Sequence, residues 1–350
     1  MTGADNILPP DETGLEKICL FPEKLASLGR NRLGTDPLYP VSVELSLTSR
    51  CNLACRWCSE LALRYRSPDR LTLKILEDLF DDLAAGGTRG ITIEGGGEPT
   101  LAPFFAEAAL AASERGLKTG LITNGLALFS EKRPPSFYEL FQWIRISLDA
   151  ASPADYLRLK GRDAFEIVLD NLARLAALNG PAVGAGYVLT NENDRPEDLA
   201  ALARKLRSLK AAYLQLRPVV DHPELVSRQS MDFLKELETE AFAVSTAAMT
   251  HNQGSGNDGL PCLAHSLAAV ITADGAVRLC GRLGQDPLAG PLGCLTEQSF
   301  RDIWHGPVRA AQTALAARGD FCRGHCPPCR MTKYNRLLNR LERIRTRDFI

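Results

Sequence analysis

The chain has 350 residues, of which 45% are hydrophobic and 24% charged, so it can bury a sizeable core and form one large domain with a smaller one. Its formal net charge of −1 and pI near 6.5 give no electrostatic case for a nucleic-acid partner. The first residues lack the apolar segment of a signal peptide and no run of about eighteen apolar residues occurs, so we expect a cytoplasmic protein without a membrane partner.

Six short β-rich runs alternate with helical stretches between residues 41 and 220, which predicts repeated β/α units and a parallel sheet. The predicted strands are Val41–Leu45, Gly90–Glu94, Lys118–Thr123, Trp143–Leu148, Ala182–Leu189 and Tyr213–Arg217. Helices are predicted at Thr72–Ala85, Ala164–Leu178 and Asp198–Lys210, where apolar residues recur at three- and four-residue spacing. If this sheet curls into a partial barrel, the residues that follow its strands gather on one face.

The composition changes after Pro218. A bridging helix is predicted at Met231–Ala247, and a polar linker follows it. The segment LAAVITADGAVRLC predicts a β-hairpin that turns at Asp274-Gly275, a strong two-residue turn signal. Further helices are predicted at Ser299–Trp304 and Lys333–Ile344. We therefore expect an N-terminal extension (1–40), a barrel (41–220), a bridging helix and linker (221–260) and a small hairpin-plus-helix domain (261–350).

Ten cysteines fall mainly into two groups, and such groups in a reducing compartment point to metal or redox work. Cys51, Cys55 and Cys58 form a C-x3-C-x2-C group just after the first predicted strand. A [4Fe–4S] cluster usually has four thiolate ligands, so a loop with three leaves one iron open to an outside ligand. The alternative is a zinc or ferredoxin site completed by a distant cysteine, in which Trp57 would be a core aromatic residue.

A glycine-rich turn ends the second predicted strand in ITIEGGGEPT. The glycines Gly95–Gly97 let backbone approach a ligand closely, and Glu98 adds an acceptor for a cationic group. Because this turn comes one β/α unit after the cysteine loop, we expect both motifs to face the same cavity. Gly184 and Gly186 do not predict a dinucleotide-binding loop, because they fall inside a strand.

The sequence CNLACRWC followed by GGGEP resembles the radical S-adenosylmethionine (SAM) superfamily over about residues 41–220. The resemblance implies an α/β fold, a partial (β/α)6 TIM-like barrel, with a [4Fe–4S] cluster on Cys51, Cys55 and Cys58 whose open iron binds SAM. It implies cleavage of SAM to a 5′-deoxyadenosyl radical that removes hydrogen from an unactivated C–H bond, with a flavodoxin- or ferredoxin-type electron donor. The residues that it places near SAM, with Trp57 beside the adenine, are Trp57, Gly96, Gly97, Glu98, Thr123, Asn124, Ser147, Asp149 and Arg217. The last five could equally be capping or surface residues.

The C-terminal cysteines form the second group. Cys262 and Cys280 bracket the predicted hairpin, and FCRGHCPPCR contains three more. This pattern resembles a SPASM domain or its shortened twitch form, which carries auxiliary iron–sulfur clusters, although no further cysteine follows Cys329 as in a full SPASM domain. Twitch spacing implies one auxiliary [4Fe–4S] cluster on Cys262, Cys280, Cys326 and Cys329, with Cys322 as a possible further ligand.

The remaining cysteines have simpler interpretations. Cys19 is interpreted as a buried, apolar-like residue. Cys294 lies in a glycine-rich loop and is a possible hydrogen donor if the reaction is an epimerisation; otherwise it is a packing residue or a cluster ligand. His265 and His325 adjoin predicted ligands and are interpreted as structural.

Three functions follow as hypotheses. The first is oxidation or epimerisation of a sugar- or aminocyclitol-like small molecule, because relatives with a twitch extension include such dehydrogenases and an auxiliary cluster can accept an electron. The second is modification of a ribosomal peptide. Residues 1–40 are too few for the usual leader-recognition domain, which counts against this hypothesis. The third, from another class, is an iron–sulfur electron carrier or zinc-binding module, which needs two closed four-cysteine sites and no SAM pocket.

Overall fold

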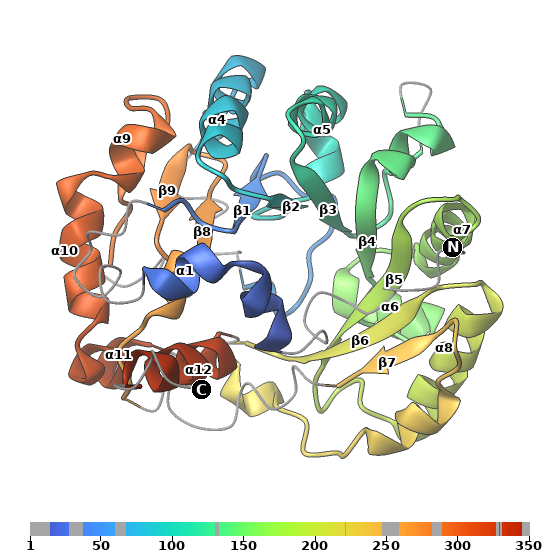
Figure 1. Cartoon of the computed structure of the whole chain (residues 1–350). Coiled ribbons are helices and arrows are strands. Elements are labelled where there is room, and N and C mark those ends of the chain that lie inside the picture. Colours follow the sequence, from blue (N-terminus) through green and yellow to red (C-terminus); the bar gives the residue numbers. More distant parts are fainter. Residues whose placement is uncertain are drawn as a thin grey trace.

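The computed structural model describes residues 15–27, 38–59, 68–129, 133–220, 222–246, 259–281, 289–326, 329 and 331–344. Within these residues a single ten-stranded sheet has the strand order β10-β9-β8-β1-β2-β3-β4-β5-β6-β7. Figure 1 shows the sheet as an arc that runs from β9 and β8 through β1 to β7, with helices along its outer side. The α/β fold and the partial barrel expected from the sequence are therefore confirmed.

The six predicted strands are all present, within two residues at each end. They are parallel to their neighbours in chain order, as repeated β/α units require. Their bounds are β1 (Ser42–Ser46), β2 (Gly90–Glu94), β3 (Lys118–Thr123), β4 (Phe141–Ser147), β5 (Ala182–Leu189) and β6 (Tyr213–Pro218).

Helices lie on the outer side of this sheet (Figure 1). They are α4 (Leu73–Ala85), α5 (Phe105–Glu114), α7 (Phe165–Ala176) and α8 (Pro196–Ser208). Helix α6 (Pro153–Lys160) follows β4 and contacts α7. The three predicted helices correspond to α4, α7 and α8. Helix α4 begins where the Thr72 side chain accepts a hydrogen bond from the Ile75 amide at 3.3 Å. The loops of this part of the chain also contain the short 3₁₀ helices η2 (Pro99–Leu101), η3 (Pro135–Leu140) and η4 (Pro223–Leu225).

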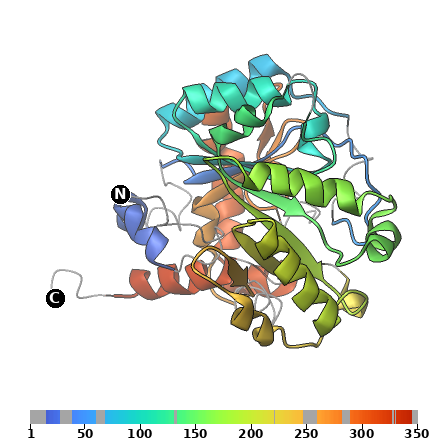
Figure 2. The same ribbon diagram turned by 90° about the vertical axis from the view of Figure 1, so that its right-hand side faces the viewer.

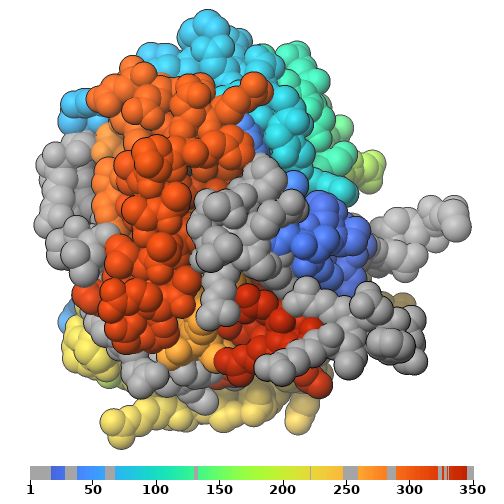
Figure 3. All heavy atoms as spheres, turned by 60° about the vertical axis from the view of Figure 1, so that its left-hand side comes forward, coloured from blue at the N-terminus to red at the C-terminus, as the bar shows by residue number. Residues whose placement is uncertain are grey.

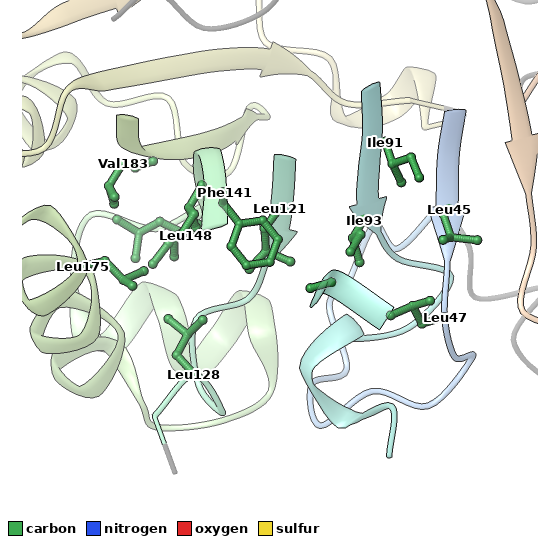
Figure 4. Close-up of a cluster of buried hydrophobic side chains, with 14 of the residues drawn as sticks. Leu45, Leu47, Ile91, Ile93, Leu121, Leu128, Phe141, Leu148, Leu175 and Val183 are labelled. Atoms are coloured by element: carbon green, nitrogen blue, oxygen red, sulfur yellow. The ribbon is translucent and has the colours of Figure 1, made fainter. Parts of the chain in front are cut away.

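The main hydrophobic core lies between the sheet and these helices. Leu45, Ile93, Leu121 and Val183 come from β1, β2, β3 and β5, and Leu175 of α7 lies near Val183 (Figure 4). Side chains alternate along a strand, so the residues between these apolar positions face the inside of the barrel. That inner face is available for a site.

The predicted bridging helix at Met231–Ala247 is wrong. The segment forms a 3₁₀ helix, η5 (Asp232–Leu237), and then a seventh parallel strand, β7 (Ala243–Ser245), that pairs with β6. Val244 is buried and its amide donates to the Glu238 carboxylate at 2.8 Å. The apolar run therefore extends the barrel sheet because β6 offers it a hydrogen-bonding edge.

The C-terminal hairpin joins the same sheet. Its strands are β8 (Ala268–Ile271) and β9 (Ala276–Arg278), and β10 (Gly293–Cys294) pairs with β9. The turn includes Asp274 and Gly275 as predicted, but it is longer than two residues, with Gly275 in the left-handed region at φ +83°. Because β8 pairs in parallel with β1, the hairpin continues the barrel beyond its first strand.

The remaining helices pack around the hairpin. They are η7 (Ala264–Ser266), α9 (Phe300–Trp304), α10 (Pro307–Ala316), α11 (Gly319–His325) and α12 (Thr332–Glu342). The predicted helices at Ser299–Trp304 and Lys333–Ile344 are confirmed as α9 and α12. Figure 3 shows α9 and α10, in orange, covering one face of the molecule above the red α12.

The N-terminal helices lie beside α12 (Figures 1 and 2). They are η1 (Leu15–Leu20) and α1 (Pro22–Ala26). Ile18 of η1 packs with Leu338 of α12 in a second small core. The interpretation of Cys19 as buried is wrong, because Ile18 takes the buried position and Cys19 is exposed. Among the described residues, no helix combines the length and hydropathy needed to cross a membrane.

Candidate functional site

The first cysteine group lies on the loop that follows β1. Cys51, Cys55 and Cys58 are half-buried free thiols, and a turn joins two of them through a 3.3 Å bond from the Cys58 amide to the Cys55 carbonyl. Burial raises the pKa of the Cys55 thiol, the Lys160 ammonium opposes that rise, and the other two thiols add to it. The three sulfur atoms therefore lie within electrostatic reach of one another.

These thiols do not converge on one point. Among the described residues, no three Cys, His, Asp or Glu side chains are arranged to hold a single metal ion. A [4Fe–4S] cluster does not need such convergence, because each thiolate binds a different iron. The donor set, three thiols on one short loop, fits the cluster predicted from the sequence.

The glycine turn packs directly against the cysteine loop. The Gly97 and Glu98 amides donate to the Thr48 and Arg50 carbonyls at 2.9 and 2.7 Å. A Cβ atom on Gly97 would lie 2.0 Å from the Arg50 carbonyl oxygen, so only glycine fits there. The two motifs thus form one structural unit at the carboxyl ends of β1 and β2, as expected.

Glu98 links the ends of β2 and β3. It is 2% exposed, and its Oε1 accepts from the Thr123 hydroxyl at 2.6 Å and from the Thr100 amide and hydroxyl. Its Oε2 accepts from the Asn124 amide at 2.7 Å. Three residues that the sequence places near SAM, Glu98, Thr123 and Asn124, are therefore bonded to one another.

The side chain of Asn124 reaches the cysteine loop. Its Nδ2 donates to Asn52 Oδ1 at 2.7 Å and lies 3.9 Å from Cys51 Sγ. An amide beside a ligand thiolate orients it and stabilises its charge. The geometry therefore places Asn124 next to a predicted cluster ligand.

Asp149 follows β4 in the left-handed region, at φ 56°. It forms a buried ion pair with Lys160, and its Oδ1 accepts from the Val188 amide at 2.7 Å. Asn193 donates to its backbone carbonyl at 3.0 Å. Both carboxylate oxygens of Asp149 therefore bond to the ends of neighbouring elements, β5 and α6.

The other predicted SAM neighbours differ in exposure. Trp57 is 6% exposed and packs in the main core. Ser147 and Arg217 are half-buried at the carboxyl ends of β4 and β6, on the inner side of the sheet. Gly96 donates its amide to Ser46 Oγ at 3.0 Å, which holds the middle of the glycine turn to the end of β1.

The sequence analysis did not identify Arg145, in the middle of β4. Arg145 is 6% exposed and donates to Gln215 Oε1 of β6 at 2.5 Å, crossing Gly186 of β5, where a Cβ would meet it at 3.1 Å. Arg145 could have been found from its place between Ile144 and Ile146. Side chains alternate along a strand, so a charged residue between two core residues faces the inside of the barrel. The inner face of the barrel thus carries a buried polar pair, Arg145 and Gln215.

The second cysteine group gathers around α10, α11 and α12. Cys280 and Cys326 pack against the same small cluster of Ala289 and Phe321. The Cys262 amide donates to the Ala316 carbonyl at 2.8 Å, at the end of α10. Buried Cys329 lies just before α12, and its sulfur accepts from the Met331 amide at 3.3 Å.

Helix α12 holds the segment that carries Cys262. Asn335 is fully buried; its Oδ1 accepts from the Leu263 and Ala264 amides at 2.6 and 3.2 Å, and its Nδ2 donates to the Pro261 carbonyl at 2.9 Å. Asn339 donates to the same carbonyl at 2.8 Å. These bonds bring residues near Cys262 and Cys329 together across about seventy residues of sequence.

Other residues of interest lie nearby. Cys294 is at the opposite end of the hairpin from Cys280, and its sulfur contacts Thr296 Oγ1 at 3.1 Å and the Asp274 carbonyl at 3.6 Å. The Cys322 side chain lies outside the described residues. His325 stacks on Phe321, and His265 is buried.

Comparisons with known families match both halves of the site. Residues 45–203 match the family described as the radical SAM superfamily, and residues 262–330 match SPASM, described as an iron–sulfur cluster-binding domain. These spans contain the first cysteine group with its glycine turn, and the second cysteine group.

Individual relatives are more distant. An S-adenosylmethionine-dependent nucleotide dehydratase of Selenomonas ruminantium is 28% identical over 57% of this chain and 76% of its own length. The mycofactocin maturase MftC of Mycobacterium tuberculosis is 26% identical over 82% of this chain and 78% of its own length. The crystal structure of Streptococcus suis SuiB shares the fold, with a TM-score of 0.64 at 15% identity over 89% of this chain and 78% of that one.

Proposed function

Because this chain belongs to the radical SAM superfamily and carries a C-terminal SPASM domain, we propose that it oxidises an unactivated C–H bond of a substrate held inside its barrel. Cys51, Cys55 and Cys58 would hold a [4Fe–4S] cluster, which would supply the one electron needed to cleave SAM to methionine and a 5′-deoxyadenosyl radical. That radical would take a hydrogen atom from the substrate and leave as 5′-deoxyadenosine. Loss of one electron to an auxiliary cluster on the second cysteine group, together with loss of a proton, would complete a two-electron oxidation of the substrate.

The position of the two cysteine groups carries this proposal. The first group follows β1, at the carboxyl edge of the parallel sheet. Cys262 precedes β8, which is parallel to β1, and Cys280 follows β9, which returns antiparallel. The second group therefore lies toward the amino edge, roughly 15 Å of strand away. A substrate in the barrel would lie between a site that starts the radical and a site that accepts its electron.

The chain's own residues bind and orient the reactants. Gly97 and Glu98 fix the cysteine loop against β2, and Asn124 extends an amide toward Cys51. Gly96, Ser147 and Arg217 lie at the same edge and remain our proposed SAM contacts, and Trp57 remains the residue that we propose beside the adenine. The polar inner face around Arg145 and Gln215 suits a hydroxylated or charged substrate better than an apolar one.

The substrate class has two candidates. A sugar- or aminocyclitol-like molecule is supported by the buried polar pair of the inner face and by the nucleotide dehydratase relative, whose match covers 57% of the chain. A peptide is supported by the maturase relative, whose match covers 82%. For either substrate we propose a flavodoxin- or ferredoxin-type protein as the electron donor.

Anaerobic reconstitution with iron and sulfide, followed by SAM and dithionite, tests the proposed reaction. We expect 5′-deoxyadenosine from the wild type and none from Cys51→Ala, Cys55→Ala or Cys58→Ala, each retaining iron in the C-terminal domain. A C262A/C280A variant should still form some 5′-deoxyadenosine but no oxidised product. Panels of cyclitols, sugar nucleotides and peptides then identify the substrate class by the increase in 5′-deoxyadenosine. Undiminished 5′-deoxyadenosine in any single-cysteine variant would contradict the proposal.

A further inference from the structure

We propose that Lys160 is a positioning residue whose buried ammonium group makes the cluster on Cys51, Cys55 and Cys58 easier to reduce. This rests on the proposed function, because it needs a cluster on those three cysteines. Lys160 is the last residue of α6, a helix that the sequence analysis did not connect with the site.

The backbone of α6 is hydrogen-bonded to the cysteine loop. The Leu159 and Lys160 carbonyls, in the last turn of the helix, accept hydrogen bonds from the Arg56 and Ala54 amides at 3.0 and 3.1 Å. These amides flank Cys55 on both sides. The helix then ends at Gly161 in the left-handed region, where a Cβ would stand 3.3 Å from Ala54 Cβ. Lys160 is therefore fixed beside Cys55 by main-chain contacts.

The ammonium group is buried with one carboxylate. The Lys160 side chain is 3% exposed and the Asp149 side chain 6% exposed, and the two form an ion pair. Because both side chains are buried, the charges of this pair are screened little by solvent.

The two charges of the pair are anchored differently. Lys160 bonds through its main chain to the Ala54 amide beside Cys55, whereas the carboxylate belongs to Asp149, just after β4. That carboxylate also accepts from the Val188 amide at 2.7 Å, so part of its charge is directed toward β5. Reduction adds one negative charge to a cluster, and a fixed cation beside a ligand stabilises the reduced state.

A buried tyrosine lies in the same helix as Lys160. Tyr156, one helical turn before Lys160, is fully buried, and its hydroxyl has no partner among the described residues. Burial raises its pKa to about 12, so it stays neutral. Tyr156→Phe therefore offers a control that changes local polarity without changing charge.

The test is a redox titration of the reconstituted holoenzyme followed by electron paramagnetic resonance. The relevant cluster is identified as the one whose signal changes when SAM is added. We expect Lys160→Met to shift its midpoint potential to more negative values, whereas Lys160→Arg keeps the wild-type potential. Tyr156→Phe and Lys74→Met, which removes an exposed lysine, should also leave the potential unchanged.

A second variant covers the risk that Lys160→Met leaves Asp149 uncompensated and fails to assemble the cluster. Lys160→Met combined with Asp149→Asn removes both charges, and we expect a potential between those of Lys160→Met and the wild type. A wild-type potential in an assembled Lys160→Met or double variant overturns the inference. Absence of any SAM-responsive cluster in the wild type would instead overturn the proposed function, so the two failures are distinguishable.

Discussion

Gly97 lies so close to Arg50 that a Cβ atom on the glycine would stand 2.0 Å from the Arg50 carbonyl oxygen. We expect Gly97→Ala to push the glycine turn off the cysteine loop, to lower the free energy of unfolding by about 1–3 kcal/mol and to reduce iron bound at the first cysteine group. Gly96→Ala is the matched control, since its Cβ would meet the nearest atom at 3.8 Å. Urea unfolding and iron analysis check both variants, and equal iron loss in the two would contradict the steric explanation.

Asn335 should matter for the second cysteine group only. Asn335→Ala leaves the Leu263 and Ala264 amides without their partner in a buried site, at a cost of about 1–3 kcal/mol for each unsatisfied group, and leaves the Pro261 carbonyl with Asn339 alone. We expect loss of the auxiliary-cluster signal with 5′-deoxyadenosine formation retained. Arg340→Ala, on the exposed side of the same helix, should keep both clusters. Retention of a full auxiliary signal in Asn335→Ala would show that α12 does not position Cys262.

His265 should make stability depend on pH. Burial, reinforced by the charges of Arg309 and Lys24, lowers its pKa to about 3, whereas in the unfolded chain it is about 6.5. Below pH 6.5 the unfolded state binds a proton that the folded state does not, so the free energy of unfolding falls by up to about 1.4 kcal/mol per pH unit. Above pH 6.5 this contribution is constant.

Urea unfolding of the apoprotein at pH 7 and pH 5 measures this effect. We expect His265→Leu to lose about 2 kcal/mol less than the wild type between these two values, because the proton-binding difference is gone. His222→Gln, at a histidine whose side chain is 33% exposed and pairs with Glu224, should follow the wild type. The same pH dependence in His265→Leu would assign the acid sensitivity to other groups.

Cys294 tests whether the reaction is an oxidation or an epimerisation. An oxidation needs no hydrogen returned to the substrate, so in deuterated water we expect product without solvent deuterium and undiminished turnover by Cys294→Ala. The contacts of its sulfur with Thr296 and Asp274 agree with a packing role. Deuterium at the product carbon, lost in Cys294→Ala, would identify an epimerisation with Cys294 as the donor.

Local patterns predicted the barrel strands well. Each strand is a short run bounded by turn residues, and the cysteine loop and glycine turn follow β1 and β2 directly, so their contact could be inferred from chain order. The segment at Met231–Ala247 could not be assigned in this way, because its strand forms only where the edge of β6 is present. The contacts of Lys160 with Asp149 and with the Ala54 amide of the cysteine loop also depend on how separate elements pack.

The pairing of β8 with β1 affects how the protein must be made. Ser42 pairs with Ala268, so during synthesis the edge of β1 stays open until more than two hundred further residues have left the ribosome. An open strand edge invites pairing with other chains. The predicted boundary near residue 260 therefore separates the two groups of sequence motifs, but both groups belong to one sheet. A fragment that ends there would lack β8, the strand that covers the edge of β1, and β1 leads into the first cysteine group.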